Sequence, residues 1–115
     1  METLKRIYVA GPISNPDGVE TARNIERGEA MAAMVMEAGY APYSPFSDSR
    51  VVGKTRLTLE EVYGVGLSFL VACHAVLVLP DYKDSIGTQR EIDVAIEHGI
   101  PVYYHINKLI MEVEV

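Results

Sequence analysis

The residues best placed to do chemistry lie in one stretch, Ala75 to Ala95, with the sequence AVLVLPDYKDSIGTQREIDVA. It opens with an apolar run rich in Val and Leu, which predicts a buried strand that ends before Pro80. A polar loop follows, and then a predicted helix carries Glu91 in its first turn. A carboxylate there can act as a nucleophile if it faces a cleft and has an acid or a hydrogen-bonding partner nearby. We therefore expect Glu91 to be the centre of any active site.

Two alternatives apply to the acidic residues of this stretch. Thr88 and Glu91 have the spacing of a capping box, in which the glutamate would bond the backbone N–H of Thr88 instead of facing a cleft. Asp81 and Asp84 could assist Glu91, or they could be ordinary turn-forming residues. Ser85, next in the same loop, adds a further side-chain oxygen.

A second polar loop follows a short strand-like run near the amino end. It could hold a phosphate or sugar hydroxyls through backbone N–H groups near a helix start, or it could be a turn that merely connects two elements. Its candidate substrate-binding residues are Gly11, Pro12, Ile13, Ser14 and Asn15. The loop has neither the GxGxxG nor the Walker pattern, so it supports neither a dinucleotide site nor an NTPase.

Basic residues outside these loops are open to two interpretations. Arg50 and Lys54 lie in a segment from Phe46 to Thr55 with the composition of a mobile surface loop, which could be a lid, and Arg56 follows this segment. These three residues could close on a phosphate or form a solvated surface. Arg23, in the first predicted helix, has the same ambiguity.

The elements that must position these residues alternate between strand and helix. Hydrophobic periodicity predicts strands over 7–10, 40–44, 75–79 and 102–106, and helices over 18–38, 58–73 and from the Glu91 turn to His98. Asp17 and Thr58 each open a capping-box pattern. The tail 107–115 alternates apolar and polar residues, which suggests an edge strand or a subunit contact.

This order predicts a three-layer α/β/α sandwich around a Rossmann- or flavodoxin-like parallel sheet of four to five strands. In the flavodoxin-like order 2-1-3-4, the first and third strands are neighbours at the switch point. Their exit loops are the two polar loops described above, so we expect the cleft to fall between them.

Length and composition narrow the class of protein. The 115 residues suffice for one compact domain, 1–115. Sixteen acidic against ten basic residues give a net charge of −6, which argues against a nucleic-acid surface. The single cysteine, Cys73, and three scattered histidines suggest no metal site, and we expect no cofactor. The sequence shows neither a signal peptide nor a membrane span, which suggests a cytoplasmic protein.

Three segments together resemble the nucleoside 2-deoxyribosyltransferase-like superfamily, most closely its short bacterial and phage branch. They are IYVAGPIS, GYAPYSP and LPDYKDSIGTQREIDVAIEHGIPV, and the resemblance extends from about Lys5 to Tyr103. It implies a Rossmann-like sheet and a small-molecule nucleoside or nucleoside 5′-monophosphate as substrate. In that superfamily, the glutamate matched by Glu91 attacks C1′ of a (deoxy)ribosyl group.

The resemblance also implies roles for the flanking residues. Ser85, Gly87 and Thr88 match the loop that meets the sugar and phosphate, Asp84 matches the aspartate that opens this loop, and Gly11 to Ser14 match the loop around base and sugar. The resemblance implies that the protein is an N-glycoside hydrolase or a deoxyribosyltransferase.

The chain departs from the family pattern at the acid that protonates the leaving base. Family enzymes carry aspartates where this chain has Gly66 and His74. Asp81, Asp84 or His74 could substitute, or the protein could be a catalytically silent nucleotide-binding module. Family members usually oligomerise, and we expect a homo-oligomer with Gly64 and Gly66 near the contact.

Overall fold

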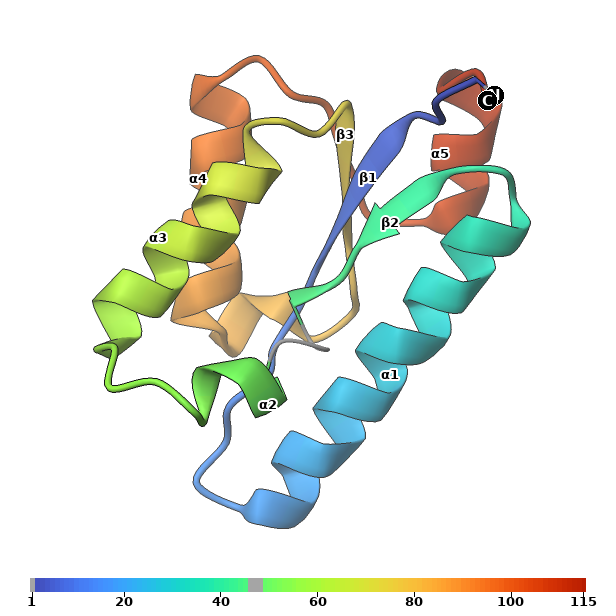
Figure 1. The fold of residues 1–115 in the computed structure, drawn as a ribbon. Helices are drawn as coiled ribbons and strands as arrows, with labels where there is room; N and C mark the ends of the chain where they lie inside the picture. The colour runs from blue at the N-terminus through green and yellow to red at the C-terminus, as the bar shows by residue number, and fades with distance from the viewer. Residues whose placement is uncertain (1, 46–48) are drawn as a thin grey trace.

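The computed structural model describes residues 2–45 and 49–115 and consists of four parallel strands flanked by helices (Figure 1). The strands are β1 (Arg6–Ala10), β2 (Ala41–Tyr43), β3 (Ala75–Val78) and β4 (Val102–Tyr103). The helices are α1 (Gly18–Glu37), α2 (Ser49–Val52), α3 (Leu59–Leu70), α4 (Ile86–Glu97) and α5 (Ile106–Glu112), with the 3₁₀ turn η2 (Tyr82–Asp84) before α4.

The sheet order is β2-β1-β3-β4, with every neighbouring pair parallel. The predicted α/β class and strand order are therefore confirmed. Strands β1 and β3 lie side by side in the middle, with Ile7 opposite Ala75 and Ala10 opposite Val78. The chain crosses one face of the sheet after β1 and the opposite face after β3. The exit loops of these two strands therefore flank the switch point.

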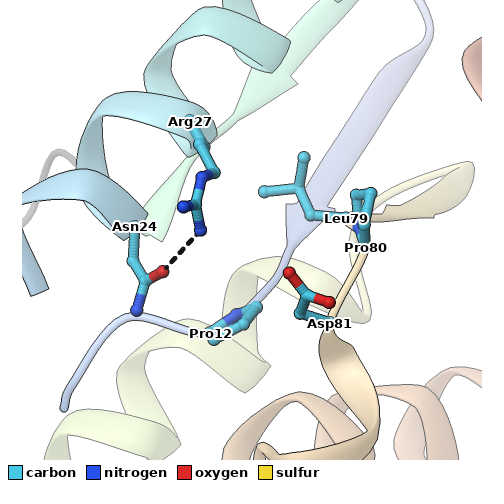
Figure 2. A pocket seen from close by; sticks show the side chains of 6 residues that line it. All are labelled: Pro12, Asn24, Arg27, Leu79, Pro80 and Asp81. Atoms are coloured by element: carbon cyan, nitrogen blue, oxygen red, sulfur yellow. Dashed lines mark hydrogen bonds between the residues drawn. The ribbon is translucent and has the colours of Figure 1, made fainter. Parts of the chain in front are cut away.

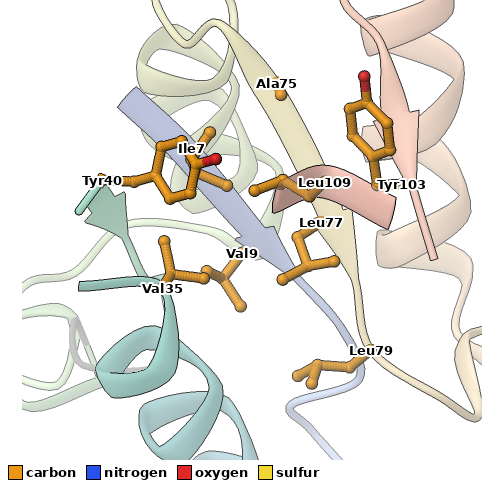
Figure 3. Packing of buried hydrophobic residues seen from close by; sticks show 9 residues of the cluster. All are labelled: Ile7, Val9, Val35, Tyr40, Ala75, Leu77, Leu79, Tyr103 and Leu109. Carbon is orange, nitrogen blue, oxygen red and sulfur yellow. The ribbon is translucent and has the colours of Figure 1, made fainter. Parts of the chain in front are cut away.

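Alternation along the central strands divides the core into two layers. Ile7 and Val9 of β1 point to the face covered by α1 and α5, where they pack with Val35 and Leu109 (Figure 3). Tyr8 and Ala10 point to the opposite face, which α3 and α4 cover. This division decides which face each candidate site residue reaches.

The helix caps agree only partly with the expected ones. Thr58 and Glu61 form the predicted capping box at the start of α3. At the start of α1, Asp17 caps the N–H of Val19 alone, since the predicted partner Glu20 pairs instead with Arg23.

The tail is a helix, so the expected edge strand is wrong. Leu109 and Val113, one helical turn apart, both pack on the α1 side of the core, and the Tyr40 hydroxyl donates to the Val113 carbonyl at 2.5 Å. Lys108 and Glu112 form an ion pair of 2.7 Å at the same spacing. The strand expected over 102–106 ends at Tyr103 because Ile106 already begins α5.

The segment expected as a surface loop, Phe46 to Thr55, contains the short helix α2, which the sequence reasoning did not predict, and its role as a lid stays a prediction. Residues 46–48 lie outside the described residues. The expectation that Arg50 acts on a phosphate stays a prediction, as do those for Lys54 and Arg56.

Candidate active site

Glu91 is buried in the second turn of α4, and only 8% of it is exposed. Its Oε2 accepts a hydrogen bond from the hydroxyl of Tyr8, which lies 83 residues earlier in β1. The pair joins the middle of the central strand to the helix that follows β3. Burial and this hydrogen bond together restrict the orientation of the Glu91 carboxylate.

The capping-box alternative for Glu91 is wrong. The N-cap of α4 is Ser85, three residues earlier than Thr88, and the Ser85 Oγ accepts from the Thr88 N–H at 3.2 Å. The N–H of Thr88 thus donates to Ser85, and the Glu91 carboxylate accepts from Tyr8 instead of from Thr88.

Aromatic rings hold Tyr8 in place. Its ring stacks on Tyr43, with centroids 5.5 Å apart, and Tyr43 stacks in turn on Phe69 of α3 at 4.6 Å. Gly66 of α3 lies against the Tyr8 hydroxyl, since a Cβ at Gly66 would come within 3.2 Å of that oxygen. The absence of a side chain at Gly66 therefore leaves room for the hydroxyl that bonds Glu91.

Burial changes the proton affinity of both partners. It raises the pKa of Glu91 to about 7, although the Tyr8 hydrogen bond acts in the opposite direction because it stabilises the carboxylate. Burial also raises the pKa of Tyr8 well above its usual range, and the neighbouring Glu91 charge adds to this rise. Tyr8 therefore stays a hydrogen-bond donor, while Glu91 exchanges its proton near neutral pH. A carboxylate with such a pKa can serve as a nucleophile or as a general acid or base.

The first turn of α4 is shielded by α3. Tyr63 lies over Gly87 so closely that a Cβ at Gly87 would be 2.5 Å from the Tyr63 hydroxyl oxygen. Arg90 stacks on the Tyr63 ring at 4.9 Å and pairs with Glu60 at 2.8 Å. Gly87 thus has a packing role in addition to the substrate-binding role predicted for it.

Ser85 and Thr88 bond each other and differ in accessibility, and their predicted contact with a sugar or phosphate stays a prediction. The Thr88 hydroxyl donates to the Ser85 Oγ at 2.8 Å, and Thr88 is only 1% exposed. Of the two side chains, that of Ser85 is therefore the more accessible to a ligand.

The loop after β1 is fixed by its own polar groups. Asn15 accepts from the Asp17 N–H at 2.9 Å and donates its own N–H to Thr21 at 2.9 Å. Within the loop, Gly11 is buried, Pro12 and Ile13 are half-buried, and Ser14 and Asn15 are exposed. Binding of a substrate by this loop stays a prediction.

The aspartates of the second loop are exposed and do not bond Glu91 within the described part of the chain. Asp81 has a φ of 65°, the left-handed conformation that Asp tolerates better than most residues, and Asp84 ends η2. The assisting role of Asp84 therefore stays a prediction. His74 does not approach Glu91, because its Nδ1 accepts from the Arg6 N–H at 2.9 Å where β1 and β3 begin.

A cavity of about 310 Å³ opens between the exit loops of β1 and β3, where the cleft was expected (Figure 2). Its lining comes from those loops and from α1, and consists of Pro12, Asn24, Arg27, Leu79, Pro80 and Asp81. Glu91 is not part of this lining. Sequence reasoning missed Asn24 and Arg27, although an asparagine in a helix interior is an unfavourable choice that signals a specific role. Arg23, which was predicted instead, is paired with Glu20 at 2.8 Å.

Two negative findings concern the described residues only. Within residues 2–45 and 49–115, His, Cys, Asp and Glu side chains do not gather in threes as a metal site would require. No helix in this part of the chain is both long enough and apolar enough to cross a bilayer.

The strand order and the helices on both faces of the sheet define a doubly wound α/β protein, and its fold is similar to that of a solved 2-deoxyribosyltransferase. A solved 2-deoxyribosyltransferase from the psychrotolerant bacterium Bacillus psychrosaccharolyticus has a TM-score of 0.61 with this chain at 20% identity. That similarity covers 84% of this chain and 69% of the other.

The family model described as "Domain of unknown function (DUF4406)" matches residues 5–104. The chain therefore belongs to the DUF4406 family. A comparison with curated proteins found no match.

Proposed function

We propose that this protein cleaves or transfers the N-glycosidic bond of a (deoxy)nucleoside or nucleoside 5′-monophosphate, with Glu91 as the nucleophile. The observation that carries the proposal is the buried Glu91–Tyr8 pair, because it combines a fixed orientation with a pKa near neutrality. The similarity in fold to a 2-deoxyribosyltransferase supports the same class of reaction.

The proposed reaction has two displacements at C1′. In the first, Glu91 forms a bond to C1′ while the C1′–N bond breaks, and the base leaves with the bonding electron pair and takes up a proton. In the second, a water molecule or another base attacks C1′ and frees the Glu91 carboxylate. Water as the acceptor gives a hydrolase, and a base gives a transferase.

Tyr8 distinguishes the two carboxylate oxygens. Because Oε2 accepts the Tyr8 hydroxyl, Oε1 is the oxygen that would bond C1′. Only the ionised carboxylate can attack, so the ionised fraction of Glu91 limits the first displacement on the acid side of about pH 7.

A second candidate function is a nucleotide-binding module without turnover. The observation that favours it is Gly66 at the Tyr8 hydroxyl, a position where the resembling enzymes carry an acid. The first proposal assigns protonation of the departing base to Asp84.

The test is incubation with a panel of ribo- and deoxyribonucleosides and their 5′-monophosphates, with free base measured by chromatography. Glu91→Gln keeps the size of the side chain and removes the nucleophile, so base release should fall to background. Glu97→Gln is the matched control, because Glu97 lies on the same helix and is exposed. Base release that survives Glu91→Gln would remove Glu91 from the nucleophile role, and ligand binding without any release would favour the binding module.

A further inference from the structure

A second pocket, of about 250 Å³, lies beside β4, the strand at one edge of the sheet. Its lining comes from η2, from α4 and from the residue after β4, and consists of Tyr82, Lys83, Gln89, Ile92, Asp93 and Tyr104. This β4 pocket shares no lining residue with the cavity between the exit loops of β1 and β3.

The β4 pocket faces away from the proposed reaction centre. Gln89, Ile92 and Asp93 share one face of α4 because they are three and four residues apart. Glu91 is two residues from Gln89 and two from Asp93, so its side chain points to the other side of the helix. A ligand in the β4 pocket therefore does not reach Glu91.

Two tyrosines form an aromatic wall of this pocket. The rings of Tyr82 and Tyr104 are tilted against each other with their centroids 5.1 Å apart. Tyr82 is half-buried against the core, whereas 42% of Tyr104 is exposed, and Ile92 adds an apolar surface that is 8% exposed. The exposed ring of Tyr104 can stack on an aromatic ring of a ligand.

Two opposite charges line the same pocket without pairing. Lys83 and Asp93 are both exposed, and within the described part of the chain neither takes part in a salt bridge. The side-chain amide of Gln89 donates to the Lys83 carbonyl, which ties η2 to α4 and so fixes the backbone of Lys83 beside the helix face that carries Asp93. An ammonium and a carboxylate are thus both available to a ligand.

We propose that the β4 pocket binds a free α-amino acid with an aromatic side chain. Its α-carboxylate would pair with Lys83, its α-ammonium with Asp93, and its ring would stack on Tyr104. A zwitterion suits this site because Asp93 repels a simple anion and Lys83 repels a simple cation. Offset or edge-to-face contacts between aromatic rings contribute more than the buried area alone, which favours an aromatic side chain.

The size of the pocket supports a small ligand. Its volume of about 250 Å³ lies just below the range of small-molecule pockets, about 300–1,000 Å³. This volume favours a single amino acid over a nucleotide. A free amino acid also carries both charges on one carbon atom, whereas a peptide carries them at its two ends.

Titration of the full isotope-labelled chain with L-phenylalanine, followed by NMR, tests this site and shows for each variant whether it is folded. We expect saturable shifts of the amide signals of Gln89, Asp93 and Tyr104. Lys83→Gln and Asp93→Asn should each weaken binding about 3- to 10-fold, because each removes one partner of an ion pair at an exposed position. Tyr104→Leu should weaken phenylalanine more than L-alanine, which has no ring.

Ligand variants identify the contact that each charged residue makes. Phenylalaninamide lacks the carboxylate, so it should bind more weakly than phenylalanine, and Lys83→Gln should not weaken it further. N-acetylphenylalanine lacks the ammonium, so Asp93→Asn should not weaken it further.

Two control variants test whether the ligand binds in the β4 pocket. Glu97→Gln removes an exposed charge from the same helix outside the pocket, and Glu91→Gln alters the proposed reaction centre; both should keep wild-type affinity. The proposal is overturned if the folded protein does not bind phenylalanine, or if phenylalaninamide or L-alanine binds as tightly. It is also overturned if Glu97→Gln weakens binding as much as Asp93→Asn, or if Glu91→Gln abolishes binding.

The outcome is separable from the proposed function, because phenylalanine has neither a sugar nor an N-glycosidic bond. Failure of base release with these binding results intact would refute only the proposed function. Absence of phenylalanine binding with base release intact would refute only the β4 pocket.

Discussion

The substitution Tyr8→Phe tests the electrostatic role of the Tyr8 hydroxyl. It keeps the ring that stacks on Tyr43 and removes only the donor to Glu91. A hydrogen bond to a charged group contributes about 1.5–3 kcal/mol, which corresponds to a change of about one to two pKa units. The pKa of Glu91, already raised to about 7 by burial, should therefore rise to about 8 or 9.

This rise predicts a specific change in the pH profile of base release. At pH 7 about half of Glu91 is ionised in the wild type, against about 10% to 1% in Tyr8→Phe, so the rate should fall about 5- to 50-fold. Most of the loss should be recovered as the pH rises by about two units. Tyr40→Phe is the matched control, because it also removes a buried tyrosine hydroxyl bond but on the other face of the sheet. An acid limb that stays at the same pH in Tyr8→Phe would refute the reasoning.

Other predictions concern stability. Folding raises the pKa of Glu91 from its ordinary value of 4.5 to about 7, so the folded state favours the protonated carboxyl group. The protonated group therefore stabilises the folded state fully below about pH 4.5, and this contribution is lost as the pH rises to about 7. In chemical denaturation, the free energy of unfolding of the wild type should fall by about 3 kcal/mol relative to that of Glu91→Gln over this pH range. A difference between the two proteins that does not change with pH would contradict the raised pKa. Gly87→Ala should destabilise by about 1–3 kcal/mol because its Cβ meets Tyr63, whereas Gly64→Ala, with no atom within 4 Å, should stabilise by up to about 1 kcal/mol. Thermal melts check both, and a stabilised Gly87→Ala would mean that Tyr63 does not cover this position. If Gly64 lies at a subunit contact, sedimentation should show that Gly64→Ala weakens the oligomer. If the wild type is an oligomer and Gly64→Ala sediments in the same way, the contact lies elsewhere.

The fold was largely predictable because its strongest signals are local. The apolar runs of β1 and β3 and the capping box of Thr58 and Glu61 each depend on neighbouring residues. The tail was mispredicted because its residues fit both a period of two and a helical period. The helix is favoured because it lets Leu109 and Val113 both pack against core residues that are distant in sequence.

The candidate site was less predictable because its key contact is not local. Glu91 was identified from its position after a strand and a polar loop, but the capping-box pattern of Thr88 competed with that interpretation. Tyr8 lies inside a strand-like run and carries no local sign that its hydroxyl reaches Glu91. Only the pairing of β1 with β3 and the packing of α4 on the sheet bring the two together.

The most direct measurement of the central claim is mass spectrometry of the acid-quenched protein after reaction with a substrate identified in the nucleoside panel. A glycosyl ester on Glu91 predicts a pentosyl mass increase on the peptide that contains this residue, with none in Glu91→Gln. Base release without an adduct in the wild type, or with an adduct that persists in Glu91→Gln, would contradict a glutamate nucleophile at this position.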